Sequence, residues 1–170
     1  MRSLLLILPL LFLASCATLS ENECRSGDWE AIGREDGAEG RREDFILQHA
    51  KACNEFGIRP NKTEWMRGRE EGLKLYCTPA KAFSEGRRGK ILSPVCPASS
   101  LATLQRANER GLRVNRIEQE IREIENEIRS INSELASLPA DDPSRSSLIS
   151  ERSFLRLDLL TLRTERARYL

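Results

Sequence analysis

The residues best suited to chemistry in this chain are its five cysteines and its single histidine, His49. Four of the cysteines follow Cys16, and an even number of cysteines after a secretory signal is typical of disulfides. These four are irregularly spaced: Cys24, Cys53, Cys77 and Cys96. A zinc site that combines them with His49 is the alternative, but the sequence has no Cys-x-x-Cys pair. We therefore expect two disulfides, no metal and no cofactor.

Cys16 has a different context, because it ends the sequence Leu13-Ala14-Ser15-Cys16. This pattern resembles the bacterial lipobox, in which cleavage falls before the cysteine and the cysteine is lipidated. Arg2 and an apolar run over 4–13 precede it, and a run of this length is too short to cross a bilayer. We expect a lipoprotein signal peptide over 1–15. The alternative is an ordinary secretory peptide that is cleaved nearby.

The residue after Cys16 is Ala17, whereas an Asp at this position commonly retains such proteins at the inner membrane. We therefore expect the outer membrane with the chain facing the periplasm, and the inner membrane only as a second choice. Several acyl chains on Cys16 would anchor the chain firmly, since one chain alone binds marginally. A lipidated tether is expected over 16–23. The net charge of +1 argues against nucleic acid as a partner.

Four cysteines allow three pairings, and geometry favours Cys24–Cys53 with Cys77–Cys96. Residues 27–40 and 43–56 are predicted to form two helices joined by a short turn at Arg41-Arg42. An antiparallel hairpin of these helices would bring Cys24 beside Cys53. Each disulfide would contribute about 3–4 kcal/mol in the chain-entropy model. A domain with few aromatic residues would need such cross-links.

A glycine motif occurs twice, thirty-five residues apart, as Gly33-Arg34-Glu35-Asp36-Gly37 and Gly68-Arg69-Glu70-Glu71-Gly72. A weaker third copy ends in Gly86 and Gly89. Glycines four residues apart lie on the same face of a helix, where each costs about 1 kcal/mol relative to alanine. Close approach of another backbone or ring would offset that cost, so we interpret all six as helix-packing glycines. A phosphate-binding loop would need a preceding strand, which the sequence does not indicate.

These features together resemble the family called domain of unknown function 2799, whose members look like small exported lipoproteins of Gram-negative bacteria. The resemblance covers about residues 24–97 and includes the glycines, Trp29, His49 and the four cysteines after Cys16. It implies an envelope location and paired cysteines. It implies no reaction.

The composition changes after Leu101, where cysteine, tryptophan, histidine and lysine are absent. Apolar residues then follow a 3-4 spacing that predicts a coiled-coil helix: Val114, Ile117, Ile121, Ile124, Ile128, Ile131, Leu135 and Leu138. Pro139 to Pro143 breaks the pattern, and a second apolar pattern runs from Leu148 to Tyr169. We expect an antiparallel helical hairpin over 101–170, with arms 101–138 and 143–170. Its register pairs residues whose numbers add up to 283, which sets Arg152 and Arg166 across the hairpin core.

Three apolar residues of the second arm do not fit this register: Phe154, Leu157 and Leu160. Either they pack onto the first domain or they form an interaction surface for another chain. That chain would be a second copy or an envelope protein, because isoleucine at both core positions favours larger bundles.

The expected fold class is therefore all-α, with a small disulfide-linked helical domain over 24–97 followed by the hairpin. The function that we expect is a structural or protein-interaction module anchored in the envelope. A periplasmic binding module for cell-wall or small anionic ligands is the alternative, and it would use arginines such as Arg41-Arg42 and Arg87-Arg88. An enzyme is not expected, because no nucleophile–base pair can be named.

Overall fold

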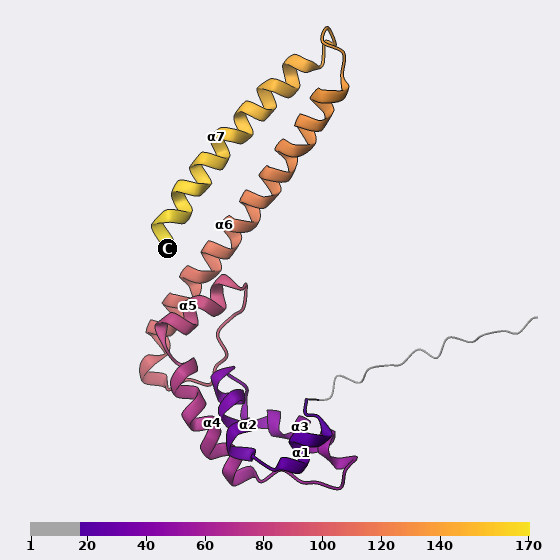
Figure 1. The fold of residues 1–170 in the computed structure, drawn as a ribbon. Helices are drawn as coiled ribbons and strands as arrows, with labels where there is room; N and C mark the ends of the chain where they lie inside the picture. The colour runs from indigo at the N-terminus through magenta and orange to yellow at the C-terminus, as the bar shows by residue number, and fades with distance from the viewer. Residues whose placement is uncertain (1–17) are drawn as a thin grey trace, which may run out of the picture.

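The computed structural model describes residues 18–170 and contains helices but no strand over that range. This confirms the all-α fold class. The predicted signal peptide and Cys16 lie outside the described residues. Figure 1 shows a small group of helices at one end and a long hairpin that extends away from it. The elements are α1 (Glu21–Ser26), α2 (Trp29–Ala38), a 3₁₀ turn η1 (Glu43–Phe45), α3 (Ile46–Asn54), α4 (Lys62–Tyr76), α5 (Pro79–Arg87), α6 (Ala98–Ser137) and α7 (Arg145–Tyr169).

Helices α2 and α4 are packed backbone against backbone at the repeated glycines. A Cβ atom on Gly33 would lie 2.0 Å from the Trp65 carbonyl oxygen, and one on Gly68 would lie 1.9 Å from the Glu30 carbonyl oxygen. Four residues further along both helices, Gly37 meets Arg69 in the same way. The two helices therefore run in the same direction and are related by an approximate two-fold axis. The interpretation of Gly33, Gly37, Gly68 and Gly72 as packing glycines is confirmed, since the two copies of the motif pack against each other.

Helices α5 and α6 form a second pair of the same kind. Gly86 lies against the backbone of Asn108, and the glycine that faces it is Gly111, where a Cβ would lie 2.2 Å from the Phe83 carbonyl oxygen. Gly111 was not expected from the motif. Gly89, in contrast, was expected to pack between helices, and that expectation is wrong. It follows α5 with a φ of +76° and ends the helix, as a glycine at this position commonly does.

The two helix pairs share details beyond their glycines. After α2, the Arg41 amide donates to the Asp36 carbonyl oxygen at 2.9 Å; after α5, the Lys90 amide donates to the Glu85 carbonyl oxygen at 3.0 Å. The partner helix then binds the carbonyl oxygen of the residue that follows each left-handed glycine. Arg69 Nε donates to Arg41 at 2.9 Å and Asn108 Nδ2 donates to Lys90 at 3.0 Å. The pair α5–α6 is thus a structural repeat of the pair α2–α4.

The predicted antiparallel hairpin of residues 27–40 and 43–56 is wrong. Helix α2 packs on α4, and its contacts with α3 are few. The disulfide between Cys24 and Cys53 nevertheless forms, because α1 and α3 lie on the same side of the α2–α4 pair and bury Trp29 and Trp65 with them. The predicted pairing of Cys24 with Cys53 is confirmed, although α2 and α3 do not form the antiparallel hairpin from which it was predicted.

The long hairpin is formed by α6 and α7, as expected. Its core contains Ile117, Ile121 and Leu159, with Ile124, Ile128, Leu162 and Tyr169 packed against them. Arg152 donates to Asn132 at 2.8 Å, and the Arg113 guanidinium lies 5.0 Å from the centre of the Tyr169 ring. Their residue numbers add up to 284 and 282, which agrees with the predicted register of 283. Arg152 and Arg166 lie across this core, and the Nε atom of each is buried without a hydrogen-bond partner among the described residues.

Helix α6 belongs to both parts of the molecule. It begins at Ala98, three residues before the predicted arm, and its first four turns pack on α5. With 40 residues it is about 60 Å long. The hairpin is therefore a continuation of the second helix pair, with no linker over 97–101. No helix over 18–170 is both long enough and apolar enough to span a bilayer.

The helix contact at Gly33 gives a direct prediction. Gly33→Ala improves helix propensity by about 1 kcal/mol but places a methyl group on the Trp65 backbone. We expect a net loss of about 1–3 kcal/mol in the free energy of unfolding, measured by urea denaturation. Glu35→Ala, at an exposed position of the same helix, is the control. A Gly33→Ala variant as stable as this control would contradict the backbone contact.

Candidate functional site

The outer face of α7 is an apolar surface that the sequence singled out and that the structure leaves uncovered among residues 18–170. Phe154, Leu157 and Leu160 are 68%, 61% and 63% exposed. The residues that face α6 recur at Leu148, Leu155, Leu159 and Leu162, which puts Leu157 on the opposite side of the helix. The expectation that these residues pack onto the first domain is therefore wrong. The other expectation, an interaction surface for another chain, fits this exposure.

A buried polar cluster holds the other end of the molecule together. The Asp36 Oδ2 atom accepts a hydrogen bond from Trp65 Nε1 at 2.8 Å and lies 2.7 Å from His49 Nε2. His49 is 2% exposed, and its Nδ1 atom lies 3.0 Å from the Thr18 hydroxyl. Both ring nitrogens of His49 are therefore engaged, one with the carboxylate and one with the hydroxyl. Each member is engaged in fixing its neighbours, so we assign this cluster a structural role.

The same cluster fixes the start of the described chain. Thr18 contacts His49, Leu19 is buried, and α1 begins at Glu21. Ser20 caps α1, and its hydrogen bonds to Glu23 hold the pKa of that carboxyl below its usual range. The tether predicted over 16–23 is therefore ordered from Thr18 onward. If a lipid is attached at Cys16, it is attached two residues from the folded domain.

Both predicted disulfides are present, with Cα–Cα distances of 5.5 Å for Cys24–Cys53 and for Cys77–Cys96. Because all four sulfur atoms are paired, they cannot serve as zinc ligands, and the zinc alternative is excluded. Cys24 and Cys53 are fully buried, whereas Cys77 and Cys96 are half-buried. The two disulfides thus differ in their access to solvent.

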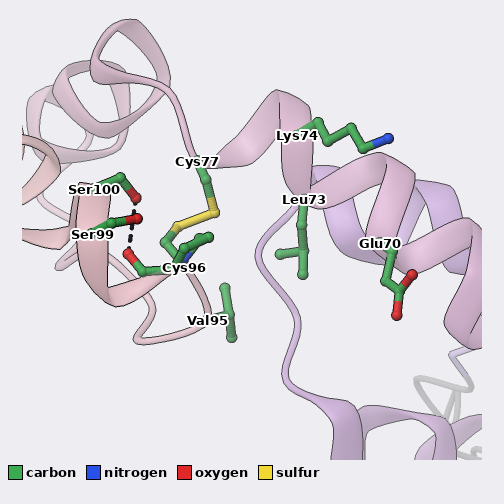
Figure 2. A pocket seen from close by; sticks show the side chains of 9 residues that line it. Glu70, Leu73, Lys74, Cys77, Val95, Cys96, Ser99 and Ser100 are labelled. Atoms are coloured by element: carbon green, nitrogen blue, oxygen red, sulfur yellow. Dashed lines mark hydrogen bonds between the residues drawn. A yellow bond between two sulfur atoms is a disulfide. The ribbon is translucent and has the colours of Figure 1, made fainter.

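The second disulfide lines a cleft between the two helix pairs. Figure 2 shows Glu70, Leu73 and Lys74 of α4 on one side and Val95 and Cys96 on the other, with the disulfide at one end. The volume is about 590 Å³. Sequence reasoning did not find this cleft, since its two walls are twenty or more residues apart in the chain and each has ordinary composition.

Tyr76 joins the two helix pairs beside this cleft. Its ring covers Gly40 of the first pair, and its hydroxyl accepts a hydrogen bond from the Ser93 amide at 2.9 Å. The ring also packs with Leu92, which lies between α5 and α6, and with Leu104 of α6. Burial raises the pKa of the Tyr76 hydroxyl. The disulfide and this tyrosine together hold the base of α6 against the first helix pair.

The arginines proposed to bind anionic ligands are engaged within the protein. Arg41 pairs with Glu39 and lies over the Phe45 ring, and Arg42 pairs with Asp44. Arg87 pairs with Glu118 of α6, and Arg88 pairs with Glu85. An anionic ligand would have to compete with a carboxylate at each of them. The geometry therefore gives no particular support to the binding-module alternative.

The buried cluster gives a prediction for Asp36. Asp36→Asn keeps the shape of the side chain but replaces a carboxylate that accepts from Trp65 and contacts His49. We expect a loss of about 1–3 kcal/mol in the free energy of unfolding. Denaturation of this variant is compared with that of Glu35→Gln, an exposed neighbour on the same helix. Equal stability of the two variants would show that the cluster does not hold the fold.

Comparison with protein-family models matches residues 28–113 to a family described as Protein of unknown function (DUF2799). Neither the search of curated proteins nor the search of solved structures found a match. The matched region contains α2 to α5 and most of the part of α6 that packs on α5. It extends past residue 97, where the sequence resemblance was expected to end, and stops two residues after Gly111.

The match covers half of the chain and coincides with its two glycine-packed helix pairs. The chain therefore belongs to the DUF2799 family.

Proposed function

We propose that this protein is a lipid-anchored lipoprotein of the cell envelope that presents the α6–α7 hairpin to a protein partner. The observation that carries the proposal is the exposed apolar face of α7, at Phe154, Leu157 and Leu160. This face belongs to a hairpin that continues directly from a cross-linked domain. Such a design separates an anchored base from a distant contact surface.

The location is inferred from the N-terminal sequence and from the disulfides. Leu13-Ala14-Ser15-Cys16 supports lipidation, and Ala17 favours the outer membrane with the chain facing the periplasm. Two disulfides within residues 18–170 suit an oxidising compartment. Because the chain is ordered from Thr18, the folded domain would lie directly on the membrane surface.

The anchor is tested by substitution of its cysteine. A Cys16→Ser chain has no thiol to lipidate, so we expect it to be released from the membrane fraction or to remain unprocessed. Fatty-acid labelling and fractionation of the envelope measure this. Ser15→Gly keeps a small residue at the cleavage site and serves as the control. A Cys16→Ser chain that is processed and still membrane-bound would contradict lipidation.

The contact surface is tested by photo-cross-linking in intact cells. A photoreactive residue at Leu157 is expected to give a discrete adduct, because this position is the centre of the exposed face. The same residue at Ser130, which is exposed on the outer side of α6, is the matched control. If Leu157 gives no adduct above that seen at Ser130, the hairpin is not a protein-interaction module.

A further inference from the structure

The exposed residues of α7 form a second regular stripe along the helix. Its members follow a 4-3-4-3 spacing: Ser150, Phe154, Leu157, Thr161 and Thr164, with Leu160 beside them. All six residues are exposed. Because α7 turns by about 100° per residue, this outer stripe lies opposite the side that faces α6. It has the spacing of a coiled-coil contact but no helix covers it within residues 18–170.

Charges of opposite sign flank the outer stripe on its two sides. Glu151, Asp158 and Glu165 follow one another at seven-residue intervals along one side. Arg156 and Arg163 follow along the other side, also seven residues apart. Two of these charges already pair with α6, since Arg163 binds Glu125 and Glu165 binds Arg113. Arg156 and Asp158 take part in no ion pair among the described residues and lie on either side of Leu157.

We propose that two copies of this chain pair in parallel through the outer stripe, with Leu157 against Leu157 and Asp158 of each copy facing Arg156 of the other. This proposal names the partner of the hairpin and rests on the proposed function. A two-fold axis that runs along α7 exchanges the flanks, so the acidic side of one copy meets the basic side of the other. Asp158 and Arg156 then differ in height by only about 3 Å.

The antiparallel alternative is disfavoured by the same charges. An antiparallel pair has its two-fold axis across the helices, which sets acidic flank against acidic flank and arginine against arginine. Like charges at an interface are destabilising, whereas opposite charges fix its register. The charge pattern therefore selects the parallel arrangement, although the apolar residues alone would permit either one.

A shared membrane would align the copies in the same way. Two chains held at their N-termini on one surface present their hairpins in the same direction, and the chain is ordered from Thr18. Three large apolar side chains per copy form less surface than the roughly 800 Å² per partner of a stable interface. The pair is therefore expected to be weak in dilute solution and to be favoured by the high effective concentration of anchored chains.

Cysteine cross-linking in intact cells separates the two arrangements. Ser150 and Thr164 lie 14 residues apart, about 21 Å along the helix. Oxidation of full-length Ser150→Cys or Thr164→Cys alone is expected to give a disulfide-linked dimer in the parallel pair. Co-expression of the two variants with different tags is expected to give few mixed dimers. Ser130→Cys and the parent chain are the controls for random collision and for Cys16.

A charge exchange provides the second measurement. Arg156→Asp sets two carboxylates against each other, and we expect the yield of Ser150→Cys dimer at limiting oxidant to fall about tenfold. Arg156→Asp with Asp158→Arg restores opposite charges in the parallel pair, so the yield is expected to recover. All of these positions are exposed, and circular dichroism checks that each variant is folded.

Each outcome bears on one claim. Cross-linking mainly between position 150 of one copy and position 164 of the other would show an antiparallel pair and overturn the proposal. No dimer above the Ser130→Cys control would also overturn it. The proposed function would survive in that second case if the photoreactive residue at Leu157 still gave an adduct with a different protein. It would fail only if that adduct were missing as well.

Discussion

The structure depends on the close approach of helix backbones at glycine. At Gly33 and Gly68 any side chain would meet a carbonyl oxygen of the facing helix within about 2 Å. Neither position can therefore carry a larger residue unless the two helices move apart. The contact fixes the two helices in parallel and in one register. That register brings Trp65 Nε1 to Asp36 and the Tyr76 ring to Gly40. The small hydrophobic core lies beside this helix contact, where the large side chains of Trp29 and Trp65 are buried.

The second helix pair, α5–α6, uses the same glycine packing to hold the start of the hairpin. Gly86 and Gly111 hold α6 on α5, and the Cys77–Cys96 disulfide and Tyr76 hold that pair to the first. Helix α6 then continues beyond Arg113 without a break. The first four turns of α6 pack on α5, and the helix continues for about six more turns. The contacts of those first turns therefore set the direction of the hairpin and the position of the outer stripe.

Local patterns predicted the parts of this structure that have a regular period. The isoleucine spacing gave the hairpin and its register, and the glycines gave the packing face of α2 and α4. The partner of Gly86, which is Gly111, was not predicted. Ala107 and Gly111 share with Ala82 and Gly86 only the four-residue spacing of small residues. In addition, Gly111 lies inside a long helical pattern. The hairpin of residues 27–40 and 43–56 failed for a related reason. Neighbours in sequence were assumed to pack, but glycine contacts favoured α4 over α3.

The end of the family match lies close to a structural boundary of the molecule. The matched region stops at residue 113, near the point where α6 passes from α5 to α7. The contacts of α6 with α5 reach Glu118, and Arg113 already binds Glu165 of α7. The helix pairs, Asp36, His49 and three of the four paired cysteines lie inside it, and they account for stability. Phe154, Leu157 and Leu160 lie outside it. If they bind a partner, that activity belongs to the extension carried by this chain, and a family member without the hairpin would keep the base but lose the contact.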